Sequence, residues 1–396
     1  MPHQPASAAL SRFRVIDLTQ VRAGPTACRQ LADWGADVVQ VQMPEHMRGD
    51  DTLGGQEGSD YQYTHRNKRS ITLNLKEPEG IALLKDLIAK ADVVVENWRP
   101  DVKDRLGLDY ESLKAINPRI ILASISGFGQ DGPYAWRPGF DQIIQGMGGL
   151  MSVTGEPEHG PIRSGLAVAD LSAGLYCAIG ILVALIERET SGQGQWVHSS
   201  LLHSQIAMMD FQMARYLNDN DVPVQVGNNH PTSSPMGLFE ASDGCFNLGA
   251  SGEGNWKRFC EVVQKPDWYQ DPEFVTEPLR VKNRERLNRL IAEEFPKKTV
   301  HQWVSLLNQA GVPAGPVYTV PQVFEDEQVK HLQVTATLPT QFGKDMHFIT
   351  QPVVLSRTPS KVVAPAPGWG EHTDEVLADL GFSATDIEGF HGRGVV

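Results

Sequence analysis

Short apolar runs alternate with stretches of helical periodicity along the first half of the chain. The periodic stretches, 26–34 and 77–91, predict amphipathic helices. Uninterrupted apolar strands that alternate with helices are typical of a parallel sheet covered on both faces. The pattern therefore predicts a large, Rossmann-like doubly wound α/β domain, with ligands beyond the carboxyl ends of its strands. The predicted strands span 13–18, 38–41, 70–75, 93–97, 120–125 and 195–200.

A helix predicted at 201–217 ends in a polar stretch, which marks a boundary to a smaller α+β domain. The elements predicted there are a hairpin of strands 237–240 and 245–248, a Gly-rich helix entry at 249–254, and helices at 280–294 and 299–310. From residue 320 the chain is Pro-rich and strand-like, and a last helix at 374–380 is expected to pack back on the first domain. The predicted domains are 1–225, 226–325 and a C-terminal return at 326–396.

One carboxylate, Asp170, stands directly before the most apolar helical pattern of the chain. Residues 171–186 carry leucine and isoleucine at helical spacing, so Asp170 is placed to cap that helix. A cap is the plain reading of such a residue on sequence alone. The apolar run 174–185 is too short to cross a bilayer and predicts a buried core helix, so no membrane partner is expected.

Composition excludes several classes of function. The 396 residues carry a formal net charge of −13 without a clustered basic face, which argues against a nucleic-acid partner. The N-terminal stretch 1–10 lacks the basic and apolar regions of a signal peptide, and it predicts a short disordered lead on a cytoplasmic protein. The four cysteines lack ligand spacing, so free thiols and no metal are expected. The turn 20–25 lacks a dinucleotide glycine fingerprint, so neither nicotinamide nor flavin is expected.

Two polar segments allow more than one interpretation. Residues 43–62 are polar and Gly-rich and predict a loop or lid. Residues 65–69, His-Arg-Asn-Lys-Arg, are either a solvated loop entering a strand or a clamp for phosphates. Polar residues also follow three predicted strands at one edge, and this favours a ligand pocket there.

Many short words, in order from about residue 12 to residue 374, resemble the class III (CaiB/BaiF-type) coenzyme A-transferases, which include formyl-CoA:oxalate and succinyl-CoA:glutarate transferases. The words are Asp-Leu-Thr-Gln-Val-Arg-Ala-Gly-Pro at 17–25, Leu-Ala-Asp-Trp-Gly-Ala-Asp-Val at 31–38, Arg-Asn-Lys-Arg-Ser-Ile at 66–71, Val-Glu-Asn-Trp at 95–98, Arg-Leu-Gly at 105–107 and Gly-Phe-Gly-Gln-Asp-Gly-Pro at 127–133. The resemblance implies an interlocked homodimer that binds acyl-CoA and a carboxylic acid, with Asp170 as nucleophile.

The resemblance also implies roles for other residues. The positions implied to hold CoA are Leu73, Asn74, Lys76, Asn97, Trp98, Arg105, Arg137 and Phe140. The positions implied on the substrate side are Gln20, Arg22 and Ala23. Backbone N–H groups must face the oxyanion that forms during acyl transfer, and Gly252 and Gly254 are the candidate donors and lid loop. Plain turn chemistry explains the same Gly-rich stretch equally well.

In the family scheme the aspartate forms a mixed anhydride with the acyl group and then an aspartyl-CoA thioester. Arg22 stands where formyl-CoA transferase has a glutamine, and we hypothesise that it binds the far carboxylate of a dicarboxylic acid such as succinate. Gln42 and Met43 also depart from the usual Glu-Arg or Glu-Pro pair, which leaves the adenine contact unassigned.

Three other functions remain as alternatives. The α-methylacyl-CoA racemases share the fold but need a histidine before the aspartate of the word at 139–141, where this chain has Phe140. A nucleotide-binding oxidoreductase lacks its glycine fingerprint here. A catalytically silent CoA-binding protein is the third, and loss of Asp170 without loss of transferase activity would favour it.

Overall fold

The computed structural model describes residues 3–47 and 55–396, which fall into two compact units. Unit 1 comprises Met1–Leu150, Arg163–Asp219 and Leu332–Val396, and unit 2 comprises Met151–Ile162 and Asn220–His331. Each unit has a core of its own, so each is described by itself.

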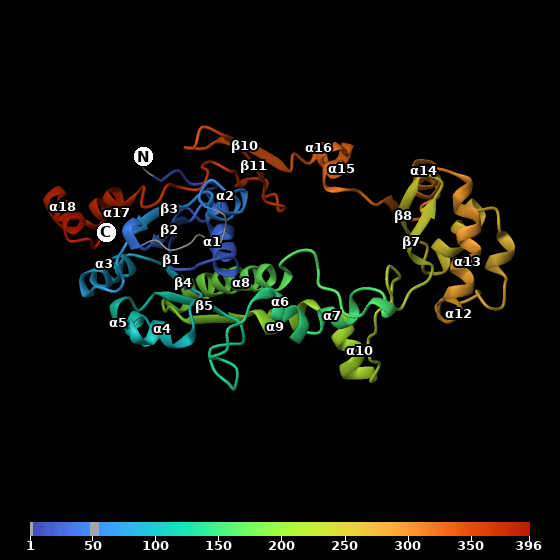
Figure 1. The fold of residues 1–396 in the computed structure, drawn as a ribbon, viewed down its shortest axis with the longest axis horizontal. Coiled ribbons are helices and arrows are strands. Elements are labelled where there is room, and N and C mark those ends of the chain that lie inside the picture. The colour runs from blue at the N-terminus through green and yellow to red at the C-terminus, as the bar shows by residue number, and fades with distance from the viewer. Residues whose placement is uncertain (1–2, 48–54) are drawn as a thin grey trace. The chain divides into compact units, whose positions relative to one another are not determined.

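Unit 1 is built on a six-stranded sheet in which every neighbouring pair is parallel (Figure 1). The strand order β3-β2-β1-β4-β5-β6 reverses direction between β1 and β4. The predicted parallel α/β architecture is therefore confirmed, and the carboxyl ends of all six strands share one edge. The strands are β1 (Arg14–Asp17), β2 (Asp37–Gln42), β3 (Arg69–Thr72), β4 (Val93–Glu96), β5 (Ile121–Ser126) and β6 (Trp196–Ser200).

Helices cover both faces of this sheet. On one face α1 (Ala23–Asp33) and α8 (Val168–Ser191) enclose a core with Val15, Val95 and Ala123. On the other face α3 (Pro78–Ala89), α5 (Tyr110–Ile116), α17 (Thr373–Leu380) and α18 (Ala384–Gly392) pack on Ile16, Val94 and Leu122. In β1, β4 and β5 neighbouring residues thus point to opposite, buried faces, as the uninterrupted apolar strands predicted, whereas the edge strand β6 is partly exposed. The remaining elements of unit 1 are η1 (Glu45–Met47), α2 (Ser59–His65), α4 (Pro100–Arg105), α6 (Asp141–Met147), α9 (Leu201–Met208), α10 (Phe211–Asp219), β10 (Thr335–Pro339) and β11 (Asp345–Ile349).

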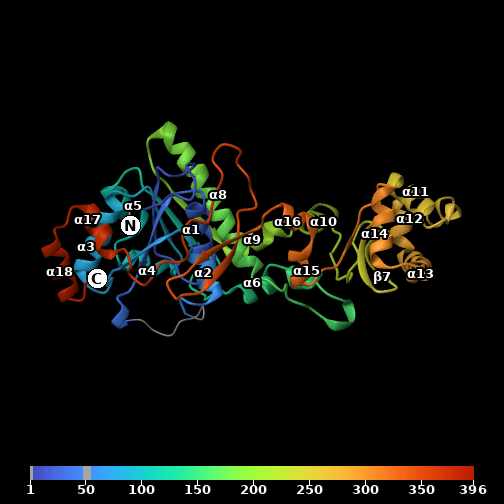
Figure 2. The same cartoon turned by 90° about the horizontal axis from the view of Figure 1, so that it is seen from above.

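Helices α1 and α8 lie side by side and approach each other closely at Gly174 (Figure 2). A Cβ atom at Gly174 would lie 2.5 Å from the Ala23 carbonyl oxygen and 2.9 Å from Thr26 Cβ. Both distances are shorter than a van der Waals contact, so the crossing depends on the missing side chain. This contact fixes the start of α1 against the first two turns of α8.

Helix α8 is longer than its apolar run and is buried on one side only. It is the one helix of the described residues that is long and apolar enough to cross a membrane by length and composition, a test that core helices also pass. Half of the apolar stretch is buried inside the unit. The predicted core helix is confirmed for one face, while Ile179, Val183 and Ile186 on the other face remain 55%, 60% and 72% exposed.

The basic residues at 65–69 form neither the solvated loop nor the phosphate clamp that the sequence allowed. Arg66 pairs with Asp33 through two hydrogen bonds of 3.1 and 2.7 Å, and both side chains are 1% exposed. Lys68 and Arg69 are buried and paired with carboxylates in the same way. Asn67 Oδ1 accepts from the N–H groups of residues 363 and 364. The basic side chains are therefore paired as buried charges must be. The hydrogen bonds of Asn67 link the segment to the returning C-terminal chain.

The N-terminal lead is also ordered where the structure describes it. The Lys361 N–H donates to the Ala6 carbonyl oxygen, and the Ser7 hydroxyl donates to Thr358. The expectation of a disordered lead is thus wrong for these residues. Of the lid predicted at 43–62, η1 and the first residues of α2 are described, and residues 48–54 lie outside the described part.

Unit 2 contains the predicted hairpin, and its core gathers large aromatic side chains such as Trp256, Phe259 and Phe295. Its elements are η2 (Pro157–His159), β7 (Met236–Ala241), β8 (Gly244–Gly249), α11 (Glu253–Val262), η3 (Pro266–Tyr269), α12 (Glu277–Lys282), α13 (Arg284–Glu294), η4 (Phe295–Lys297), α14 (Val300–Gln309), β9 (Ala314–Pro316), α15 (Val320–Glu325) and α16 (Glu327–His331). The short helix α7 (Leu150–Val153) lies at the boundary of the units.

Several predicted boundaries are wrong for local reasons. The helix expected at 201–217 breaks into α9 and α10 at Asp210, which has φ +43°. The strand-like stretch predicted from residue 320 begins later than expected, because Thr319 and Gln322 form a capping box that starts α15. The strands β10 and β11 follow further along the chain and confirm the rest of that prediction. α18 follows α17, which the sequence reading took as the last helix; it begins at a second capping box, formed by Ser383 and Asp386.

We predict that Gly174→Ala lowers the free energy of unfolding by about 1 to 3 kcal/mol, because the added methyl group must push α1 away from α8. Chemical denaturation measures this change. Gly392→Ala in α18 is the matched control, since a Cβ there meets no atom within 4 Å and alanine favours a helix. Equal stability changes in both variants would contradict the close helix contact.

Candidate active site

Asp170 lies in the first turn of α8 but does not cap it. The helix begins at Val168, and its N-cap residue Ala167 makes no side-chain hydrogen bond. The predicted capping role of Asp170 is therefore wrong. The cap comes from α6 instead, where Asp141 Oδ1 accepts from the Ala169 N–H at 2.9 Å. Because another carboxylate fills the capping position, the Asp170 side chain is not needed for the helix.

Asp141 is held by a network of its own. Its Oδ2 accepts from Gln145 Nε2 at 2.7 Å, and Arg163 Nη2 lies 3.8 Å away. Gln145 also donates to the Leu166 carbonyl oxygen and accepts from the Ser164 N–H. This network shapes the chain immediately before α8. The sequence reading quoted Asp141 only as part of the word at 139–141 and missed this role, because no local signal links it to a helix 28 residues away.

The surroundings of Asp170 raise the pKa of its carboxyl group from 3.8 to about 6. Burial is the largest cause, the negative charge of Asp141 is the second, and the positive charge of Arg22 acts in the opposite direction. In the part of the chain that the structure describes, no group donates a hydrogen bond to this carboxylate. A poorly solvated carboxylate of raised pKa is still ionised at neutral pH, and it is a stronger nucleophile than an ordinary one.

The turn between β1 and α1 reaches the same region. Arg22 is the residue before α1, and its Nη2 donates a hydrogen bond to Asp60 Oδ2 of α2. Its charge is close enough to act on Asp170. Ala23 is buried, and its carbonyl oxygen faces Gly174 in α8. Gln20 is exposed, and its backbone is hydrogen-bonded to Asn97 beyond β4. The turn residues expected on the substrate side therefore lie at the carboxyl edge near Asp170.

The residues expected to hold CoA are spread along the same edge of the sheet and beyond it. Leu73 is buried in the core, so only its backbone is available to a ligand. Asn74 is tied to the backbone of residues 394 and 395, while Lys76 is exposed. Arg105 is 67% exposed and pairs with Asp101 at 3.3 Å.

The other predicted positions lie on loops or in unit 2. The Trp98 N–H donates to Glu96 at the end of β4. The Arg137 guanidinium stacks on the Tyr134 ring at 3.7 Å, and Phe140 is 69% exposed. Gly252 and Gly254 lie at the start of α11, where Gly252 has φ +76°. Their role as oxyanion donors stays a prediction.

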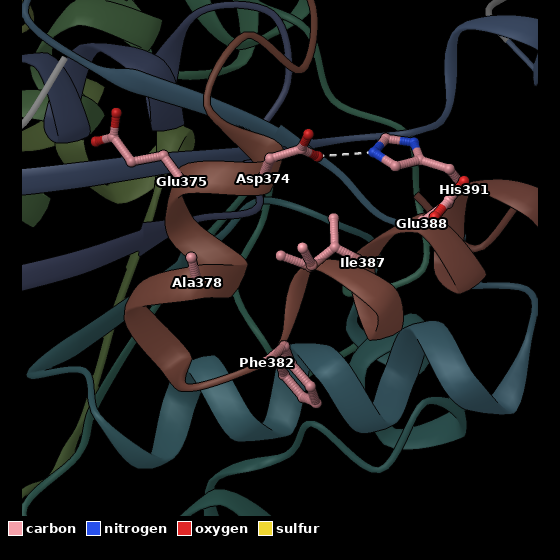
Figure 3. A pocket seen from close by; sticks show the side chains of 8 residues that line it. Asp374, Glu375, Ala378, Phe382, Ile387, Glu388 and His391 are labelled. Atoms are coloured by element: carbon pink, nitrogen blue, oxygen red, sulfur yellow. Dashed lines mark hydrogen bonds and ion pairs between the residues drawn. The ribbon is translucent and has the colours of Figure 1, made fainter.

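Unit 1 has one cavity next to the residues expected to bind CoA and another cavity that none of them lines. One of about 520 Å³ opens at the carboxyl ends of β2 and β3, next to Leu73, and is lined among others by His46, Thr72 and Trp369. Another of about 560 Å³ lies at α17 and α18, where Asp374 and His391 are 2.7 Å apart (Figure 3). No residue expected at the site lines this second cavity. Among the described residues no cluster of histidine, cysteine and acidic side chains suits a metal ion.

The raised pKa of Asp170 has a consequence for stability. An ionised Asp170 destabilises the fold above about pH 6, whereas the protonated form does not, so stability falls as the pH rises from 3.8 to about 6. We predict that Asp170→Asn raises the free energy of unfolding by about 1 to 3 kcal/mol near neutral pH and leaves it unchanged near pH 4. Denaturation at the two pH values measures it. Asp345→Asn, at an exposed position of β11, should show no such difference.

Comparisons with known proteins agree on one family. The model of CoA-transferase family III matches residues 10–373. The succinate–glutarate CoA-transferase of Agrobacterium fabrum is 39% identical over 94% of this chain and 95% of its own length. The human succinyl-CoA:glutarate CoA-transferase is 34% identical over 94% of this chain and 86% of its own.

Solved structures point the same way. A CaiB/BaiF family protein from Brucella suis is 36% identical, covers 96% of this chain and all of its own, and superposes with a TM-score of 0.80. Together with the parallel sheet and the family words along the sequence, these matches leave one assignment. The chain belongs to CoA-transferase family III, and it is a CoA-transferase.

Proposed function

We propose that this enzyme transfers CoA from succinyl-CoA, or another dicarboxylyl-CoA, to a carboxylic acid acceptor, with Asp170 as the nucleophile. The observation that carries the proposal is the Asp170 carboxylate, which is partly buried, has no hydrogen-bond donor among the described residues and has a pKa raised to about 6. Relatives named as succinyl-CoA transferases for glutarate, D-citramalate and mesaconate, each 34% identical, support the class of donor.

The proposed reaction has four steps that return the enzyme to its starting state. An Asp170 oxygen attacks the thioester carbonyl, the C–S bond breaks, and a mixed anhydride and CoA thiolate form. The thiolate then attacks the aspartyl carbonyl and releases the first acid as its carboxylate, which leaves an aspartyl-CoA thioester. The acceptor carboxylate attacks this thioester and expels the thiolate. The thiolate finally attacks the acceptor carbonyl and regenerates the Asp170 carboxylate.

Each of these steps passes through a tetrahedral oxyanion that needs N–H donors. We propose the backbone N–H groups of Gly252 and Gly254 for this purpose. The interlocked homodimer is likewise proposed, and the exposed apolar side chains of α8 at residues 179, 183 and 186 support it, because such a stripe is typical of a protein interface. We propose the cytoplasm as the location.

Arg22 supports a dicarboxylic substrate. Its guanidinium has five donors, and one nitrogen is engaged by Asp60, so other donors remain for a substrate carboxylate. Its positive charge already acts on Asp170, so a carboxylate bound to it would lie close to the nucleophile. The racemase alternative has no such support, since Phe140 stands where the racemases have their second base, and its side chain cannot accept a proton.

We predict that the enzyme incubated with succinyl-CoA, without an acceptor, gains a covalent CoA adduct on the peptide that contains residue 170. Hydroxylamine should convert this thioester to a hydroxamate at the same residue, as peptide mass spectrometry detects. Asp170→Asn should form no adduct, and Asp345→Asn should form it normally. Transferase turnover with an unmodified residue 170 would refute the nucleophile, and CoA binding with neither adduct nor turnover would favour the silent CoA-binding protein.

We predict that Arg22→Gln lowers the preference for dicarboxylic over monocarboxylic acceptors by about 10-fold to 100-fold, which corresponds to the loss of a charged hydrogen bond. The preference is the ratio of kcat/KM for two acceptors of matched length at one pH. Any change in the reactivity of Asp170 cancels in this ratio, because both acceptors share the nucleophile. Arg12→Gln, an exposed arginine paired with Glu189, is the control. An unchanged ratio would refute the role of Arg22.

A further inference from the structure

The turn between β1 and α1 contains a residue in a strained backbone conformation. Val21 has φ +64°, in the left-handed region that β-branched residues avoid. Its side chain is 41% exposed, so burial of that side chain does not explain the conformation. Such strain persists only where the surrounding structure holds it in place.

The Asn97 side chain forms hydrogen bonds with both backbone groups of Gln20, the residue before Val21. The Gln20 N–H donates to Asn97 Oδ1 at 2.9 Å, and Asn97 Nδ2 donates to the Gln20 carbonyl oxygen at 2.7 Å. One side-chain amide thus satisfies the donor and the acceptor of a single residue. This paired arrangement fixes the plane of the backbone on the N-terminal side of Val21.

The backbone on both sides of the Asn97–Gln20 hydrogen bonds is itself held in place. Glu96 is 1% exposed, and its Oε2 accepts from the Trp98 N–H at 2.9 Å, which holds the backbone around Asn97 at the end of β4. On the other side, the Thr19 N–H donates to Asp17 Oδ1, and Asp17 forms a fully buried ion pair with Lys68 at 2.8 Å. The turn is therefore held by the buried carboxylates of Asp17 at the end of β1 and Glu96 at the end of β4. We call the two hydrogen bonds between Asn97 and Gln20 the clamp.

The conformation of Val21 sets the direction of the next residue, Arg22, whose charge acts on Asp170. A left-handed residue reverses the local course of the chain, so the φ of Val21 decides where Arg22 and the start of α1 point. In the structure Arg22 reaches Asp60, and its charge acts on Asp170. A relaxed Val21 would turn Arg22 away from that direction.

We infer that Asn97 is a positioning residue, which holds Val21 in its strained conformation and thereby aims Arg22 at Asp170 and at the substrate carboxylate. This inference rests on the proposed function of Arg22 and Asp170. It differs from the role in CoA binding that the family resemblance implies for Asn97, because the side-chain oxygen and one N–H group are engaged by Gln20.

The experiment combines Asn97→Ala with Val21→Gly. Glycine adopts a positive φ without strain, so it keeps the turn in place when the clamp is lost. We expect Asn97→Ala to reduce the rate of adduct formation at Asp170 and the preference for dicarboxylic acceptors by about tenfold or more each, as a displaced contact near the reacting atoms does. We expect the affinity for free CoA, measured by calorimetry, to change less than about threefold. Val21→Gly in the same chain should restore most of both losses.

Matched controls separate positioning from general stability. Asn117→Ala removes an asparagine that also bonds to backbone groups, at 2.9 Å to Ala91 and 3.0 Å from Arg119, but lies outside the site. Gln264→Gly relieves a positive φ of 59° in unit 2 and should not rescue Asn97→Ala. Amide hydrogen exchange of the Gln20 N–H should become faster in Asn97→Ala. This measurement detects the loss of the hydrogen bond independently of enzyme activity.

The outcomes distinguish this inference from the proposed function. A loss of CoA affinity as large as the loss of adduct formation, with no rescue by Val21→Gly, would make Asn97 a CoA ligand and overturn the inference. Rescue by Gln264→Gly would make the effect one of stability and overturn it too. If wild-type enzyme forms the Asp170 adduct and Asn97→Ala behaves like it, the inference fails alone. If wild-type enzyme forms no adduct, the proposed function fails first.

Discussion

The site depends on which carboxylate caps α8. The free N–H groups of a helix start attract the nearest acceptor, and an aspartate in the first turn would ordinarily be stabilised there. In this chain Asp141 from α6 takes that place through the Ala169 N–H. Asp170 is left partly buried, beside a like charge and without a donor among the described residues, and the result is a pKa of about 6. A destabilised carboxylate of this kind is what a nucleophile for acyl transfer requires, and the fold tolerates it because the rest of α8 packs tightly on α1.

The sheet brings this carboxylate and the first turn to one place. β1 and β4 are neighbours at the point where the strand order reverses, so the segments that leave their carboxyl ends meet. Asn97 and Gln20 are joined there by two hydrogen bonds. α8 begins at the same edge because it leads back into β6, which is parallel to β5. Strand order, helix start and turn conformation therefore act together on Arg22 and Asp170.

Sequence reasoning predicted the features that depend on local pattern. The apolar strands, the hairpin of β7 and β8 and the parallel architecture followed from periodicity and turn residues. It did not predict the features that depend on a contact with a residue far away in the sequence. The carboxylates that neutralise the basic residues at 65–69 come from β1, α1 and β2, and no spacing in the sequence reveals them. The same limit applies to the site, since the acceptor from α6 that caps α8 and the hydrogen bonds of Asn97 join residues far apart in the chain.

Burial and the charge of Asp141 together make Asp170 a basic carboxylate. The most direct test is the pH dependence of single-turnover adduct formation with succinyl-CoA, from about pH 4.5 to about pH 8, in wild type and in Asp141→Asn. We predict that the rate falls toward acidic pH with a midpoint of about 6 in wild type, because only the ionised carboxylate attacks. We predict a midpoint at lower pH in Asp141→Asn, because removal of the like charge lowers the pKa of Asp170. A wild-type rate that stays nearly level down to about pH 4.5, as a carboxyl group with the ordinary pKa of 3.8 would give, and that is unchanged in Asp141→Asn, would contradict the raised pKa of Asp170.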